Sequence, residues 1–223
     1  MELINCEFAG EVCGENSVAG IIGEVKGNQQ LSVKNCQTSG KIAHDGGLYS
    51  SGIAGIIGIA EVESCIIEDC TNRSKIPTTK NISSVGGVCG WIQAVSSVTI
   101  SNSKNYEIVQ CYSHGGGIAG RIWANEVEIE NCSNANIVGT VDKSYEIGGI
   151  AGRLDVSSGT VSMCNNFGQF IAAHRAGGIV GDCEGNVAIT RCSNTGSGVP
   201  VSSGEYYSVR WYSGKRRQYI ILQ

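Results

Sequence analysis

The chain has 223 residues, 41% of them hydrophobic, and a formal net charge of −4. This hydrophobic content is sufficient for a buried core and is not that of a disordered chain. The acidic balance argues against a nucleic-acid partner, which selects a basic surface. No apolar run approaches the ~20 residues of a membrane-spanning helix, so we expect no membrane span.

A glycine-rich phrase recurs along most of the chain. Each copy places an aliphatic residue between small residues and ends in a glycine, as in Gly148-Gly149-Ile150-Ala151-Gly152. The closing glycines are interpreted as Gly23, Gly55, Gly90, Gly120, Gly152 and Gly181, at intervals of 32, 35, 30, 32 and 29 residues. Such a period is typical of a solenoid, whose units cannot bury a core alone and must stack.

A second cue, Asn-Cys or Asp-Cys, follows the closing glycine. It occurs at Asn5-Cys6, Asn35-Cys36, Asp69-Cys70 and Asn131-Cys132, becomes Asn102-Ser103 once, and weakens to Met163-Cys164 and Arg191-Cys192. The first copy has no glycine phrase before it, so we expect the chain either to be cut from something longer or to begin on an incomplete coil. The first residues also lack the basic and apolar regions of a signal peptide.

Apolar and polar residues alternate around this cue, as in Glu126-Val127-Glu128-Ile129-Glu130. That period indicates half-buried strands and excludes helices. Asparagine recurs two residues after the cysteine position and should form an internal ladder of Asn72, Asn105, Asn134, Asn166 and Asn194. The sequence therefore predicts an all-β, right-handed parallel β-solenoid (β-helix) of six to seven coils, each of about 31 residues.

The repeat ends near residue 198, which predicts one solenoid domain over residues 1–198. Residues 199–223 are aromatic and apolar, and Ser213-Gly214-Lys215 predicts a turn. The last coil of a solenoid exposes its core and its strand edges. We therefore expect a C-terminal β cap made of a hairpin, or the start of a following segment.

The eleven cysteines include no pair with the two-residue spacing of zinc or redox sites. Six share one position of the repeat: Cys6, Cys36, Cys70, Cys132, Cys164 and Cys192. We expect reduced thiols packed in the core as small hydrophobic side chains. The alternative is a disulfide ladder, since stacked Cα atoms ~4.8 Å apart fall within disulfide range. We predict no metal and no cofactor.

No catalytic motif rises above the repeat. Gly115-x-Gly117-x-x-Gly120 spells a dinucleotide fingerprint, but a strand continues where that site requires a helix. The histidines, His44, His114 and His174, precede the glycine phrases and are expected to be exposed turn residues. We assign no catalytic residue.

The best surface candidate comprises two outward positions after the closing glycine. Its residues are Trp91, Arg121, Trp123, Arg153, Asp155 and Glu184. Stacking should place Trp91 beside Arg121, Trp123 near Gln93, and Arg153 beside Asp182. Aromatic faces with charged edges suit a sugar ring, although a cation–π pair and an ion-pair ladder that only stabilise the solenoid would use the same residues. Asp155 and Glu184 would also lie near the ~5 Å separation of retaining glycosidases.

The phrases Gly-Gly-Ile-Ala-Gly and Gly-Gly-Ile-Val-Gly, with the following Asn-Cys-Ser-Asn at residues 131–134, resemble the GLUG repeat of bacterial cell-surface proteins. The resemblance covers about residues 1–198. It implies a parallel β-solenoid in a larger secreted protein, at the cell surface or outside the cell. Its implied role is a non-enzymatic rigid stalk or adhesive module, adhesin-like, with a glycan or a host or cell-surface protein as partner.

Two other functions stay open. One is a carbohydrate-active β-helix enzyme, a polysaccharide hydrolase or lyase; the other is a segment of a phage or secreted fibre. The sequence leaves the oligomeric state undecided.

Overall fold

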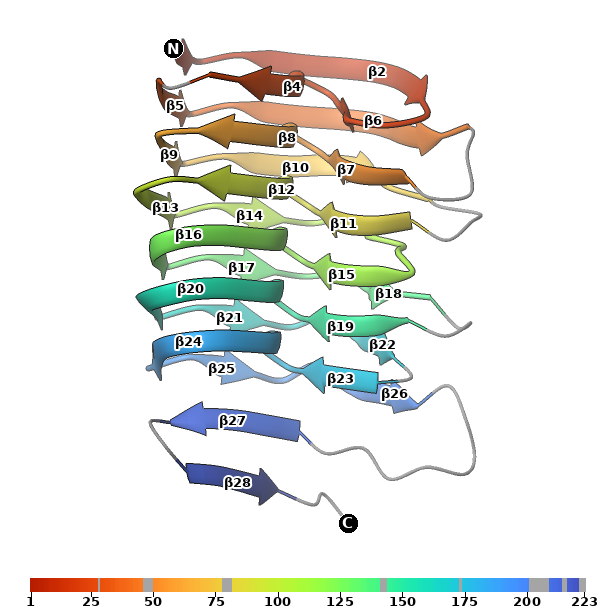
Figure 1. The fold of residues 1–223 in the computed structure, drawn as a ribbon. Coiled ribbons are helices and arrows are strands. Elements are labelled where there is room, and N and C mark those ends of the chain that lie inside the picture. The colour runs from red at the N-terminus through yellow and green to blue at the C-terminus, as the bar shows by residue number, and fades with distance from the viewer. Residues whose placement is uncertain are drawn as a thin grey trace.

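The computed structural model describes residues 1–27, 29–45, 50–77, 82–140, 144–172, 174–200, 209–213 and 216–220. These residues form strands, bridges, turns and bends, and none of them is helical. No helix with the length and hydropathy of a membrane crossing therefore occurs in this part of the chain. The strands wind into a solenoid of about six turns (Figure 1). In Figure 1 the chain descends from its N-terminus, with the strands nearest the viewer running to the left and the fainter, more distant strands running to the right. A chain that winds in this sense forms a right-handed coil.

The largest sheet has ten parallel strands and turns a corner of the coil. Early coils cross this corner as two separate strands, whereas β16, β20 and β24 cross it as one curved strand each (Figure 1). Its strands are β1 (Glu2–Ile4), β4 (Ile22–Lys26), β5 (Gln30–Lys34), β8 (Ile57–Val62), β9 (Ser64–Glu68), β12 (Cys89–Ala94), β13 (Ser97–Ser101), β16 (Ala119–Glu130), β20 (Ala151–Ser162) and β24 (Val180–Thr190).

Three further parallel sheets complete the coils. The seven-stranded sheet contains β2 (Glu7–Gly14), β6 (Gln37–His44), β10 (Thr71–Lys75), β14 (Lys104–Asn105), β17 (Ser133–Asn134), β21 (Asn165–Asn166) and β25 (Ser193–Asn194). The six-stranded sheet contains β3 (Val18–Ala19), β7 (Ser50–Ala54), β11 (Ile82–Gly86), β15 (Ser113–Gly116), β19 (Tyr145–Gly148) and β23 (His174–Gly177). The smallest contains β18 (Val138–Gly139), β22 (Phe170–Ala172) and β26 (Gly198–Pro200).

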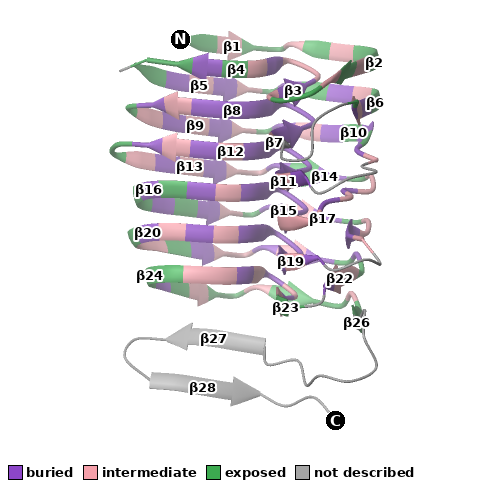
Figure 2. Cartoon of the chain, turned by 45° about the vertical axis from the view of Figure 1, so that its right-hand side comes forward, coloured by how far each residue is buried: buried purple, intermediate pink, exposed green. Residues whose placement is uncertain are grey.

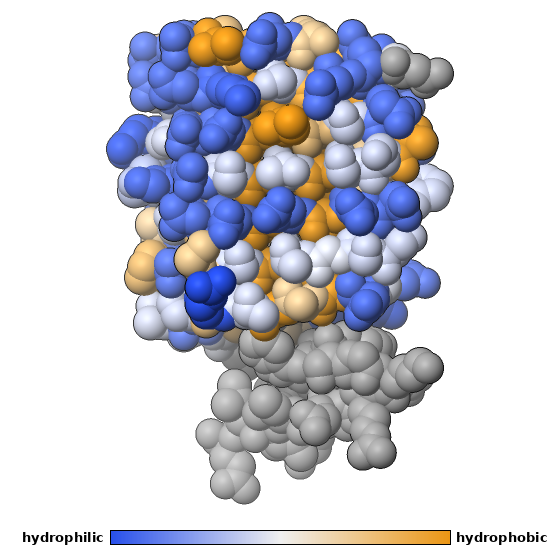
Figure 3. Space-filling view, turned by 90° about the vertical axis from the view of Figure 1, so that its left-hand side faces the viewer, coloured by the Kyte–Doolittle hydropathy of each residue, from blue (hydrophilic) through white to orange (hydrophobic). Residues whose placement is uncertain are grey.

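The core is the inside of this coil, and the predicted aliphatic ladder runs through it. Strand register pairs Val33 with Ile67, Ile67 with Ile100, and Ile100 with Ile129, and all four side chains are fully buried. Figure 2 shows buried residues along the middle coils and more exposed ones in the first and last described coils. Hydrophilic side chains cover most of the outer side shown in Figure 3, as the alternation in β16 predicts.

The predicted asparagine ladder is also present. Asn72 Nδ2 donates to Asn105 Oδ1 at 2.7 Å, and Asn105 Nδ2 donates to Asn134 Oδ1 at 2.7 Å. The next two steps, to Asn166 and then to Asn194, are 2.8 Å each. Each amide also donates to a carbonyl oxygen two residues later in its own coil, so a buried polar group that would otherwise be costly is satisfied.

The cysteines behave as core residues. All eleven are free thiols, and Cys13 is the exposed one. At the repeated position the thiol points inward and donates to the carbonyl oxygen two residues earlier, as Cys70 does to Glu68 at 3.3 Å. Burial raises the pKa of the Cys65 and Cys111 thiols to about 12, which disfavours the reactive thiolate.

One assignment of the glycine phrase is wrong. Strand β8 places Ile57 opposite both Ile22 and Cys89, so the third coil closes its phrase at Gly58 and not at Gly55. The error arises because Ile53-Ala54-Gly55 and Ile56-Ile57-Gly58 fit the same pattern. The outward positions of this coil are consequently Ile59 and Glu61.

A rung of left-handed backbone explains why the phrase must close with glycine. The left-handed rung consists of Ser17, Gly52, Ser84, His114, Glu146 and Arg175, whose φ angles lie between 49° and 74°. A Cβ on Gly152 would lie 2.6 Å from the carbonyl carbon of His114, and one on Gly181 would lie 2.7 Å from that of Glu146. The closing glycine thus admits the backbone of the rung against the sheet.

The chain ends in β27 (Val209–Ser213) and β28 (Arg216–Ile220), which pair antiparallel as a hairpin requires. In Figure 1 they follow the last coil. Gly214 and Lys215 of the predicted turn lie outside the described residues.

Candidate functional site

The residues predicted to form a binding platform lie on the outer face of the ten-stranded sheet. The register pairs Trp91 with Arg121, Gln93 with Trp123, and Arg153 with Asp182, as the sequence predicted. Asp155 lies between Trp123 and Glu184 in the second outward column. Strands β12, β16, β20 and β24 therefore bring all six candidate residues onto one surface.

Only one of the two tryptophans is open to solvent. The Trp123 side chain belongs to the exposed large hydrophobic residues, with an exposed fraction of 52%. Trp91 is half-buried, and its indole Nε1 is buried without a hydrogen-bond partner. Its column neighbours are Ile59 and Arg121. The platform therefore offers a single exposed indole.

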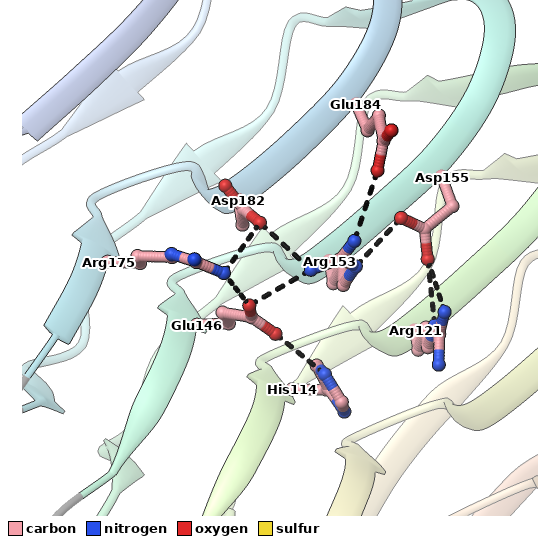
Figure 4. A network of polar contacts seen from close by, with 8 residues as sticks. All are labelled: His114, Arg121, Glu146, Arg153, Asp155, Arg175, Asp182 and Glu184. Carbon is pink, nitrogen blue, oxygen red and sulfur yellow. Dashed lines mark hydrogen bonds and ion pairs between the residues drawn. The ribbon is translucent and has the colours of Figure 1, made fainter.

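Arg153 lies at the centre of the charged groups (Figure 4). Its Nε donates to Asp155 Oδ1 at 2.7 Å, and its Nη2 lies 3.2 Å from Glu184 Oε2. Its Nη1 lies 3.1 Å from Asp182 Oδ2. Asp155 is also paired with Arg121, whose Nη2 lies 2.7 Å from Asp155 Oδ2. Arg153 thus bridges the two carboxylates that the sequence suggested as a glycosidase pair.

Three more residues of the left-handed rung, none of them predicted as site residues, join these charged groups. Glu146 accepts from His114 Nε2 at 2.6 Å and from Arg153 Nη1 at 3.0 Å. Arg175 Nη1 pairs with Glu146 and with Asp182, the latter at 3.4 Å. The available signal was their common place, three residues before the middle glycine of successive phrases.

We call the eight residues of Figure 4 the charged cluster: His114, Arg121, Glu146, Arg153, Asp155, Arg175, Asp182 and Glu184. The expectation that the histidines are exposed turn residues is wrong for His44 and His114. His44 is buried in β6, and His114 lies half-buried in β15. His174 is exposed on β23, where its ring stacks on Tyr145 at 5.1 Å.

The pKa values in the cluster reflect its partial burial. Burial raises the pKa of Glu146, but the hydrogen bond and charge of His114, with Arg153 and Arg175, outweigh it and bring that pKa down to about 2. Burial and the nearby Glu146 carboxylate raise the pKa of Asp182. Burial lowers the pKa of Arg153. The carboxylates of Asp155, Glu146 and Asp182 raise it by more than burial lowers it, so the pKa lies above its usual value.

The acidic and basic side chains of the charged cluster neutralise one another. Asp155, Asp182 and Glu146 are each paired with two or three arginine or histidine side chains, so their oxygens face protein donors. The His114 Nδ1 atom is buried, which leaves the imidazole without a nitrogen presented to a substrate. Within the described ranges, no three His, Cys, Asp or Glu side chains converge as metal ligands would.

With the fold and the cluster defined, comparison with known proteins gives no relative: no protein-family model, curated protein or solved structure matches the chain.

Proposed function

We propose that this chain is a rigid, non-enzymatic module of a larger secreted or cell-surface protein, where it acts as a stalk and presents an adhesive face. The observation that carries the proposal is the asparagine ladder from Asn72 to Asn194, buried from Asn72 to Asn166, which ties five successive coils along the axis. The resemblance of the glycine phrases to GLUG repeats supports the surface location.

Stiffness follows from how the coils are joined. Parallel backbone ladders connect every pair of neighbouring coils in the described solenoid, and the charged cluster adds ion pairs that join three successive coils on one side. Bending the solenoid would stretch hydrogen bonds on one side of the axis in several ladders at once. A buried hydrogen bond left unmade costs about 1–3 kcal/mol, so straight stacking is strongly favoured.

A spin-label distance measurement tests this stiffness. Ser32 and Ala188 lie in one outward column, five coil steps apart. At about 4.8 Å per step, their backbones should be about 24 Å apart. Labels introduced there through noncanonical residues, which leave the cysteines untouched, should give one narrow distance distribution, with the denaturant-unfolded protein as the broad control. A broad distribution in the folded protein would contradict a stalk.

The charged cluster supports a second candidate, a polysaccharide hydrolase or lyase. What favours it is the adjacency of Asp155 and Glu184 in one outward column, next to the exposed Trp123. Incubation with a panel of neutral and acidic polysaccharides should release neither new reducing ends nor unsaturated sugars if the module is non-enzymatic. Product formed by the natural sequence and lost in Glu184→Gln would instead establish the enzyme.

A further inference from the structure

Two exposed aromatic side chains lie on the seven-stranded sheet, away from the charged cluster. Tyr106 follows β14 and Phe167 follows β21, with exposed fractions of 37% and 57%. Backbone hydrogen bonds place them in one outward column: Tyr106 N donates to Asn72 O, Ala135 N to Asn105 O, and Phe167 N to Asn134 O, at 3.0, 2.9 and 2.8 Å. The exposed Ala135 is therefore the residue between them.

This spacing leaves a gap one coil wide, which we call the aromatic slot and define by Tyr106, Ala135 and Phe167. Coils about 4.8 Å apart put the backbones of the two aromatic residues about 9.6 Å apart. The methyl group of Ala135 does not fill that space. A ring inserted midway would lie about 4.8 Å from each aromatic ring, within the separation that stacked rings adopt.

Arg73 orients one wall of the slot. It precedes Tyr106 in the same column, and its guanidinium carbon lies 4.2 Å from the centre of the tyrosine ring. The cation thus covers the ring face that is directed toward the preceding coil. A ring inserted in the slot would therefore stack on the opposite face of Tyr106.

Polar groups border the slot along the neighbouring outward column. That column contains Lys104, Ser133, Asn165 and Ser193. Ser193 Oγ donates to Asn165 Oδ1 at 2.6 Å, so part of this border is already ordered. Apolar walls beside hydroxyl, amide and ammonium groups suit a ligand with apolar C–H faces and hydroxyl edges.

We propose that the aromatic slot binds a hexopyranose ring of a glycan, held between Tyr106 and Phe167 and hydrogen-bonded along its edge. This inference deepens the proposed function, on which it rests, by locating the adhesive face. The slot is the better candidate than the predicted platform because the arginines and carboxylates around Trp123 are paired with one another, whereas both aromatic faces of the slot lie free of such a network.

The test is a glycan array with the full chain, followed by calorimetric titration with the glycans that bind. Phe167→Ala removes one wall, and Ala135→Phe fills the slot from an exposed position that tolerates a larger side chain. We expect about a tenfold loss of affinity in Phe167→Ala and complete loss in Ala135→Phe. Trp123→Ala is the matched control and should bind as the natural sequence does, with all melting temperatures unchanged.

Other outcomes separate the slot from the stalk. Binding that survives Ala135→Phe but is lost in Trp123→Ala would overturn the slot and move the adhesive face to the platform. The absence of glycan binding by the natural sequence at millimolar concentration would also overturn the slot, while a narrow spin-label distribution would still support the stalk. A broad distribution with binding lost in Ala135→Phe would overturn the stalk alone.

Discussion

The Glu146 carboxylate accepts a hydrogen bond from His114 Nε2, in the preceding coil, at 2.6 Å. Both residues have positive φ angles, 55° for Glu146 and 49° for His114. Residues other than glycine and asparagine seldom adopt this backbone conformation. The next coil repeats the arrangement with Arg175, at φ 49°. The ion pairs on this left-handed rung thus help to compensate a backbone strain of about 1–3 kcal/mol per residue.

Glu146→Gln should destabilise the protein because it leaves Arg153 and Arg175 without their most buried partner. We expect the free energy of unfolding in urea to fall by about 2 kcal/mol. Glu68→Gln is the matched control, since it breaks an exposed pair with Lys34 and should cost about 0.5 kcal/mol or less. Equal losses in the two variants would contradict the role assigned to the cluster.

The pH dependence of stability should carry the signature of Glu146. Its folded-state pKa of about 2 lies below its ordinary 4.5, so its stabilisation is present above pH 4.5 and is lost as the pH falls toward 2. We expect a contribution of about 2 kcal/mol across this window, measured by urea unfolding at a series of pH values. Asp182, with a raised pKa, acts in the opposite direction, because its cost disappears on protonation. The same loss in Glu146→Gln would rule out Glu146 as the source.

Asn105→Ala should break the asparagine ladder at its centre. Asn105 is buried and donates both to Asn134 Oδ1 and to Glu107 O at 2.7 Å, and it accepts from Asn72. We expect a loss of about 2–4 kcal/mol and a lower melting temperature, because buried amides of the ladder lose their partners. Asn131→Gly removes an exposed hydrogen bond to Asn102 while keeping a residue that accepts positive φ. That control should change stability by about 0.5 kcal/mol.

The native protein should react slowly with thiol reagents at its buried cysteines and rapidly at the exposed Cys13. Cys65, Cys89 and Cys111 are buried, and burial raises the pKa of each thiol. In the folded protein we expect Cys13 to be modified first and the buried thiols to stay unmodified, with eleven thiols reactive after unfolding without reductant. Fewer than eleven thiols in the unreduced, unfolded protein would show that a disulfide ladder has formed.

The inward ladders could be predicted because each coil must place an aliphatic, cysteine or asparagine side chain at the same depth. Ile67, Ile100 and Ile129 therefore recur at one position and stack as expected. The phrase in the third coil was aligned wrongly, because two consecutive tripeptides there, Ile53-Ala54-Gly55 and Ile56-Ile57-Gly58, satisfy the same pattern. Only pairing with β4 and β12 distinguishes Gly58 from Gly55.

The charged cluster was only half predictable. Arg121, Arg153 and Asp155 followed from alternation after the closing glycine. His114, Glu146 and Arg175 did not, because nothing in a histidine, glutamate or arginine signals a left-handed backbone. By contrast, the same conformation at Asn5, Asn35 and Asn131 coincides with residues that tolerate it, which explains why the Asn-Cys cue could be recognised.

The amides of the asparagine ladder all donate in the same sense, from each coil to the one that follows it, and Thr38 Oγ1 donates into Asn72 in that sense as well. Their dipoles therefore add along the axis instead of cancelling. At one end of the ladder an amide oxygen accepts from a donor in the preceding coil, and at the other end an amide nitrogen needs an acceptor in the following coil. The two ends of the solenoid are therefore chemically different. Any further coil stacked on the solenoid would have to match this polarity, and head-to-head stacking of two solenoids would set like ends of the ladder against each other.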